Sequence, residues 1–81
     1  MRLVDLQGNR TMAWRTGREC LAENLKELRR ELGWSQERLA LEAGLHRTFV
    51  AHVERGTRNI SLDNIDKLAL ALGKGTYELL M

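Results

Sequence analysis

The sequence contains no proline, a single cysteine and few aromatic residues, and these low counts limit the possible fold classes and cross-links. Aromatic residues make up 5% of the 81 positions. Residues that favour strands are therefore few, whereas Leu, Ala, Glu and Arg are abundant, and this balance predicts an all-α fold. Because Cys20 has no second cysteine to pair with, an intramolecular disulfide is excluded, which favours a reducing compartment.

Long apolar runs are missing as well. The longest are far too short to span a bilayer, and the N-terminus lacks an apolar core of signal-peptide length. We therefore expect a cytoplasmic protein with no membrane association. The net charge of +2 also shows that the chain as a whole is not a polycation.

The length supports one small domain. Residues 1–15 show no clean periodicity and predict an irregular or mobile arm, with Trp14 docking on the domain formed by residues 16–81. Capping residues and glycines divide that domain into five expected helices. The expected helices follow Thr16, Ser35, His46, Ser61 and Thr76, and the first four end near Gly33, Gly44, Gly56 and Gly73.

The fourth expected helix has a clear apolar stripe, which we interpret as its buried face: Leu62, Ile65, Leu68, Ala69 and Leu72. Leu70 lies well away from this stripe in helical angle. The last helix, expected over residues 77–80, is more apolar than a free chain end requires.

Two short helices joined by the segment EAGLH form the most informative motif. A tight glycine turn between two such helices is typical of a helix-turn-helix, although a generic helical hairpin has the same loop. Ala40 is small where the helices cross, and Gly44 supplies a positive-φ turn. Val50 and Val53 seal the second helix against the core. Together with Gln36 at the start, this spacing favours the helix-turn-helix.

The second helix of the motif has an apolar side and a polar side. At about 100° per residue, Phe49, Val50 and Val53 cluster on one side. The other side carries Arg47, Thr48, Ala51, His52 and Arg55. Three arginines and one acid, Glu54, lie between His46 and Asn59. A local basic stripe on a near-neutral protein fits nucleic-acid binding, whereas a solvated face is the alternative.

The string SQERLALEAGLHRTFVAHVERGTRN resembles the phage-repressor and Cro-like (Xre-type) helix-turn-helix family over roughly residues 18–80. The string GLHRTFVAHVERGTRNISLDNIDKLA is similar to controller proteins of restriction–modification systems, which are small dimeric regulators with close variants of HRTY and ERG.RN. The ERG.RN motif also occurs in many phage and chromosomal regulators. Phe49 stands where the controllers commonly have tyrosine, so a phosphate contact from that hydroxyl is lost.

The resemblance implies a compact five-helix lambda-repressor-like domain that binds double-stranded DNA and regulates transcription. In this family the second helix of the motif enters the major groove. The residues that would then face the bases are Arg47, Thr48, Ala51 and His52. Those that would contact the backbone are Gln36, with its helix N-terminus on a phosphate, Arg55, Thr57, Arg58 and Asn59. The family also implies an ion pair between Arg29 and Glu54.

A homodimer on a palindromic operator follows from the same resemblance. Its predicted seam lies on the fourth and last helices, at Leu70, Tyr77, Leu79 and Leu80. No enzyme activity, cofactor or small-molecule ligand is implied. The two histidines and Cys20 lack metal-binding spacing, so we expect no metal site. His46 stands where the family often has a serine cap, so we expect it to cap the helix or to be exposed to solvent rather than to contact a base. The alternatives are a DNA-binding antitoxin and a protein-interaction module on the same fold.

Overall fold

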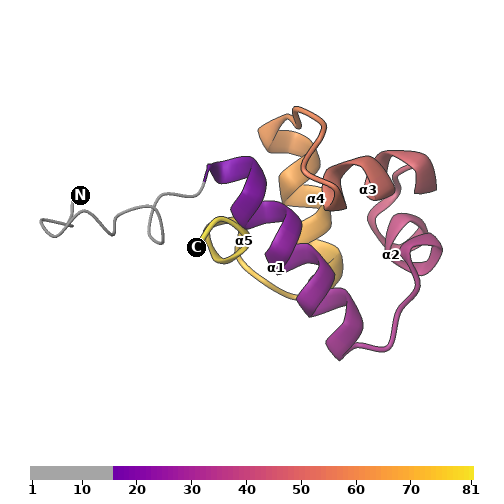
Figure 1. The fold of residues 1–81 in the computed structure, drawn as a ribbon. Helices are drawn as coiled ribbons and strands as arrows, with labels where there is room; N and C mark the ends of the chain where they lie inside the picture. Colours follow the sequence, from indigo (N-terminus) through magenta and orange to yellow (C-terminus); the bar gives the residue numbers. More distant parts are fainter. Residues whose placement is uncertain (1–15) are drawn as a thin grey trace, which may run out of the picture.

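Five helices and no strands make up residues 16–81, the part of the chain that the computed structural model describes. They are α1 (Gly17–Glu31), α2 (Gln36–Ala43), α3 (Arg47–Glu54), α4 (Leu62–Leu72) and α5 (Thr76–Leu79) (Figure 1). The predicted all-α, five-helix fold is confirmed. The arm predicted over residues 1–15, including Trp14, lies outside the described residues. None of the described helices has the length and apolar character needed to cross a membrane.

Side-chain caps start four of the five helices. Thr16 and Glu19 form a reciprocal capping box on α1, in which the Thr16 hydroxyl accepts from the Glu19 N–H at 3.1 Å. Ser35 and Ser61 cap α2 and α4 in the same way, each accepting from a backbone N–H three residues later. At α3 the Thr48 N–H donates to His46 Nδ1 at 3.2 Å. His46 is therefore a cap and is also exposed, and these are the two roles expected for it.

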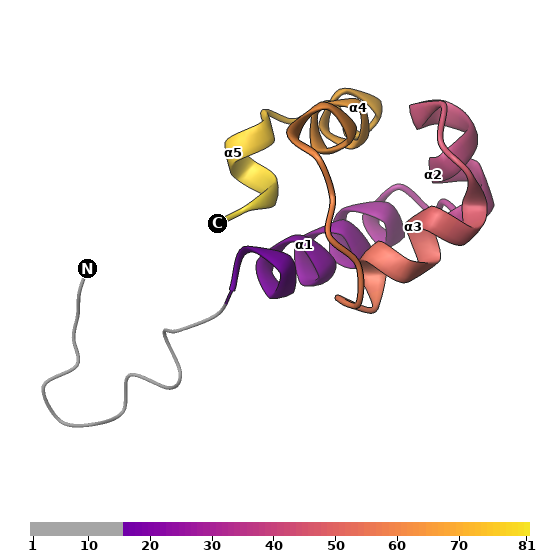
Figure 2. The same ribbon diagram turned by 90° about the horizontal axis from the view of Figure 1, so that it is seen from above.

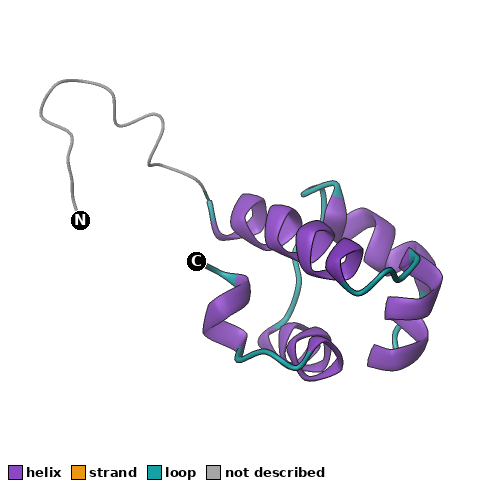
Figure 3. Cartoon of the chain, turned by 90° about the horizontal axis from the view of Figure 1, so that it is seen from below, coloured by secondary structure: helices purple, strands orange, loops and turns teal. Residues whose placement is uncertain are grey.

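The helices enclose one core, in which the largest fully buried side chains are Leu21, Leu25, Leu39, Leu68, Leu79, Val50 and Val53. Helix α1 packs against α3 and α5, while α2 packs against α3 and α4. Seen from above, α5 and α2 lie at opposite ends of the domain (Figure 2), and the view from below agrees (Figure 3). Helix α3 therefore lies away from the C-terminus.

The turn between α2 and α3 has the predicted left-handed glycine. Gly44 has φ of 71°, a conformation that a side chain with a Cβ opposes, and it is the C-cap of α2. Leu45 continues the turn and donates its N–H to the Ala40 carbonyl at 2.9 Å. Because Ala40 is 3% exposed, the two helices meet at a small side chain. These features give the helix-turn-helix its short connection.

Three expectations about the last two helices are wrong. Leu62 is 70% exposed, because it is the first residue of α4 and helical side chains point toward the N-terminus, past the core. Helix α5 starts at Thr76, and Gly75 is its N-cap. The Thr76 hydroxyl instead donates to Asp66, and the Glu78 carboxylate accepts from the Gly75 N–H at 2.7 Å.

Leu79 is also buried rather than exposed at a dimer seam, with 0% of its surface accessible. Its position is fixed from α1, because the Asn24 side-chain amide donates to the Leu79 carbonyl at 2.9 Å. Folding of α5 back onto α1 thus places Leu79 in the core, where a second copy of the chain has no access to it.

Candidate nucleic-acid interface

Helix α3 has a buried side and an exposed side, as its sequence predicts. Val50 and Val53 are 0% and 1% exposed, and Glu54 is 4% exposed. Arg47 and Thr48 are exposed in the first turn, whereas Ala51 and His52 are half-buried. The buried side holds α3 against the domain, and the exposed side is available to a ligand.

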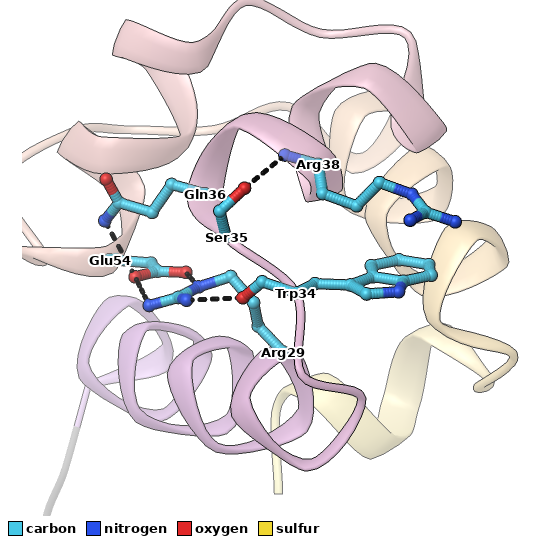
Figure 4. Close-up of polar contacts among 6 residues, drawn as sticks. All are labelled: Arg29, Trp34, Ser35, Gln36, Arg38 and Glu54. Atoms are coloured by element: carbon cyan, nitrogen blue, oxygen red, sulfur yellow. Dashed lines mark hydrogen bonds and ion pairs between the residues drawn. The ribbon is translucent and has the colours of Figure 1, made fainter.

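A hydrogen-bonded network around Glu54 joins three segments of the chain (Figure 4). Arg29 donates to both carboxylate oxygens of Glu54, through Nε at 2.7 Å and Nη2 at 3.0 Å. Arg29 Nη1 also donates to the Trp34 carbonyl at 2.8 Å, and Gln36 Nε2 donates to Glu54 Oε1 at 2.9 Å. The ion pair between Arg29 and Glu54 is thus present, with Gln36 as an additional member.

The donors of this network pair the Glu54 carboxylate, whose burial without a partner would cost free energy. The hydrogen bonds that Arg29 donates to Glu54 raise the pKa of Arg29 above its ordinary value, against the opposite effect of burial. Because a guanidinium is already charged at any physiological pH, this shift does not create a titrating switch. The ion pair between Arg29 and Glu54 thus neutralises both charges inside the domain.

The exposed side of α3 and the following loop is therefore cationic. Between His46 and Asn59, Glu54 is the only acidic residue, and its carboxylate faces inward to Arg29. Arg47, Arg55 and Arg58 are exposed on the same segment. The exposed charges of this segment are therefore all positive, although Arg55 borders a groove that also holds Glu19 and Glu23 of α1.

The end of α3 is closed by contacts around His52. Arg55 Nη2 lies 3.3 Å from His52 Nδ1. The Thr57 N–H and hydroxyl both donate to the His52 carbonyl, at 3.3 Å and 3.2 Å. The structure thus brings together three of the predicted site residues at the C-terminal end of the helix.

Arg58 occupies an unexpected position. The sequence placed it beyond the far end of α3, but its guanidinium carbon lies 5.4 Å from the centre of the Phe49 ring, in the first turn of that helix. The Arg58 side chain therefore extends from the loop after α3 to the side of the helix that carries Phe49. No periodic pattern relates these two positions, so the sequence does not predict the contact between Phe49 and Arg58.

Gln36 and Asn59 differ from the other predicted backbone contacts. The Gln36 amide is bonded to Glu54, which leaves the N-terminus of α2 as the group that faces outward there. Asn59 lines a shallow groove shared with Gly17 and Leu80, near the start of α1. Gln36 therefore belongs to the Glu54 network, whereas Asn59 lies at a different groove from the contacts around His52.

Apolar side chains are exposed on the last two helices. Leu70 on α4 is 82% exposed, Tyr77 is 70% exposed, and Leu80 is 37% exposed. Among the described residues, no group of three or more His, Cys, Asp or Glu side chains is arranged to hold a metal ion. The surface that stands out besides α3 is thus apolar and lies on α4 and α5.

Comparison with known proteins agrees with the helix-turn-helix and its exposed arginines. A family model described as "Helix-turn-helix" matches residues 25–79. The chain belongs to the helix-turn-helix family. The predicted Xre-type membership is thereby confirmed.

Curated relatives include control proteins. The chain is 52% identical over 64 residues to a hypothetical transcription factor of Neisseria meningitidis, covering 79% of this chain and 60% of that protein. It is 59% identical over 46 residues to Control protein C.BamHI of Bacillus amyloliquefaciens, covering 57% of each. It is 44% identical over 63 residues to Control protein C.SmaI of Serratia marcescens, covering 78% of this chain and 75% of that one. The chain thus spans less than two thirds of the first two relatives.

Two solved structures resemble the domain closely. The hypothetical transcription factor NHTF from Neisseria superposes with a TM-score of 0.79 at 44% identity, covering 100% of this chain and 84% of that one. The restriction-modification controller protein C.AhdI from Aeromonas hydrophila gives a TM-score of 0.74 at 50% identity, covering 76% of this chain and 94% of that one. The predicted similarity to controller proteins is confirmed.

Proposed function

We propose that the chain is a homodimeric regulator of the controller type, which binds a palindromic double-stranded operator in the cytoplasm and thereby acts on transcription. The observation that carries this proposal is the cationic segment formed by α3 and the loop after it, in which Arg47, Arg55 and Arg58 are exposed while Glu54 is turned inward. The similarity to C.BamHI, C.SmaI and C.AhdI supports the controller type.

The residues of α3 divide by position into two roles. Arg47, Thr48, Ala51 and His52 read base edges from the groove-facing side of α3. Arg55, Thr57, Arg58 and Asn59 contact the sugar–phosphate backbone, as does the N-terminus of α2 at Gln36. An arginine that bonds to guanine discriminates bases, whereas one on a phosphate adds affinity for every sequence. The two roles therefore separate in binding measurements.

The test begins with selection of bound duplexes from a random-sequence library by the unmodified protein. We expect one palindromic sequence to be enriched. Arg47→Ala should then relax the preference at one base pair in each half-site and retain most affinity for a scrambled duplex. Arg58→Ala should weaken both duplexes alike and reduce the salt slope by about one per subunit. Failure to enrich any sequence would contradict the proposal, and equal weakening of both duplexes by Arg47→Ala would make Arg47 a backbone contact.

The dimer is proposed to form through the exposed apolar side chains of α4 and α5, namely Leu70, Tyr77 and Leu80. Leu70→Asp should shift the protein to monomer in sedimentation experiments and weaken operator binding. Leu41→Asp is the matched control, because Leu41 is 75% exposed on α2, outside the proposed seam. A wild-type protein that stays monomeric at high concentration and still binds the palindrome tightly would rule out this dimer. A dimer should favour half-sites about one helical turn apart.

A further inference from the structure

Arg58 lies over the ring of Phe49. The roles proposed above give Arg58 a phosphate contact but give Phe49 no part in DNA binding. The guanidinium carbon of Arg58 lies 5.4 Å from the ring centre, within the range of a cation–π interaction. Phe49 is half-buried and packs against the core. One part of its ring is thus anchored in the domain while the ring supports an exposed arginine.

The backbone after α3 is folded so that this contact can form. Gly56 has φ of 71°, and its N–H donates to the Val53 carbonyl at 2.9 Å. The next residue, Thr57, donates to the His52 carbonyl through both its N–H and its hydroxyl. These bonds fix the turn at the end of α3, and from the loop that follows the Arg58 side chain extends to the Phe49 ring.

A second arginine in the molecule shows what is distinctive about Arg58. Arg38 also lies over an aromatic ring, 4.9 Å from the centre of Trp34, but its Nε is paired with the Glu42 carboxylate at 2.8 Å. Arg58 takes part in none of the ion pairs found within residues 16–81. An aromatic ring orients a guanidinium without neutralising it, so Arg58 is held in place with its charge still available.

We infer that Phe49 is a positioning residue, whose ring holds the Arg58 guanidinium beside the first turn of α3 for contact with a DNA phosphate. This inference rests on the proposed function and assigns to Phe49 a part in DNA affinity that needs no polar atom. The ring limits the orientations of a long side chain before DNA arrives, so less freedom is lost when the phosphate contact forms.

The experiment is a double-mutant cycle on Phe49 and Arg58. Phe49→Leu keeps an apolar side chain but removes the ring, and Phe49→Tyr keeps the ring. Binding is measured for the duplex selected by the unmodified protein and for a scrambled duplex, across a salt series. Circular dichroism and thermal unfolding of each variant show whether α3 is intact. We expect Phe49→Leu to weaken both duplexes about two- to five-fold per bound subunit. Phe49→Tyr should bind at least as tightly as the unmodified protein, because it keeps the ring and adds a hydroxyl that can contact a phosphate.

The decisive comparison is made in the Arg58→Ala background, where we expect Phe49→Leu to have no further effect on binding. If Phe49→Leu weakens binding equally with and without Arg58, the ring acts only through the packing of α3 and the inference is wrong. A loss confined to the selected duplex would also overturn it, because that result assigns Phe49 to base discrimination. Failure of the unmodified protein to bind either duplex would instead refute the proposed function.

Discussion

Two arginine–glutamate pairs of nearly equal length lie in very different parts of this domain. Arg29 Nε and Glu54 Oε2 are 2.7 Å apart, and Arg38 Nε and Glu42 Oε2 are 2.8 Å apart. The side chains of the first pair are 13% and 3% exposed, whereas those of the second are 51% and 40% exposed. The first pair joins α1 to α3, and the second joins two turns of α2. Distance alone therefore does not reveal which ion pair the fold depends on.

The largest effect should come from removing the carboxylate of the buried pair. Glu54→Ala leaves the Arg29 charge without its partner in a largely buried site, which costs about 3–5 kcal/mol of unfolding free energy. Chemical denaturation of the variant and the unmodified protein measures this difference. A loss below about 1 kcal/mol would show that water replaces the carboxylate and that the two pairs are alike in energy.

An intermediate effect is expected at Gln36, which belongs to the same network without carrying a charge. Gln36→Ala removes the bond to Glu54 at 2.9 Å but leaves both bonds from Arg29. A hydrogen bond to a charged group contributes about 1.5–3 kcal/mol, and the low end applies because Glu54 keeps other donors. Denaturation midpoints should therefore fall between those of the Glu54→Ala variant and the unmodified protein. A midpoint as low as that of Glu54→Ala would contradict this ranking, because losing the Gln36 bond would then cost as much as losing the carboxylate.

The smallest effect should come from the exposed pair. Glu42→Ala removes a contact between residues four apart on the surface of α2, and such contacts contribute about 0.3–0.5 kcal/mol. We expect a shift in unfolding free energy of that size, which high salt should abolish because exposed charges are screened. A salt-independent loss of more than about 1 kcal/mol would contradict the comparison between exposed and buried pairs.

Local patterns predicted most of the helical framework. Helix starts at Thr16, Ser35, His46 and Ser61 depend on a cap and the residues that immediately follow, so they can be read from adjacent positions. The turn at Gly44 likewise depends on one backbone conformation. The start of α5 was placed one residue late because Gly75 caps it without a side chain, using the Glu78 carboxylate instead.

What sequence patterns missed depends on contacts between distant segments. Leu79 is core rather than surface because α5 folds back onto α1, where Asn24 binds its carbonyl. The Arg58 side chain reaches Phe49 from an irregular loop after α3. Helical periodicity carries no information about either arrangement. The proposed base and phosphate contacts remain predictions, since they concern a complex with DNA.

The bond between Gln36 and Glu54 has a consequence for how the domain meets DNA. Gln36 is the first residue of α2 and Glu54 the last of α3, so the two ends of the helix-turn-helix are joined directly, at 2.9 Å. Arg29 on α1 donates to Glu54 and also to the Trp34 carbonyl, which lies just before α2, so α1 is bonded to both ends of the unit. The helix-turn-helix is thus a chain segment whose two ends are held together by hydrogen bonds, so its shape is set before it meets DNA. Association then requires little loss of backbone entropy, and affinity is left to depend on the contacts themselves.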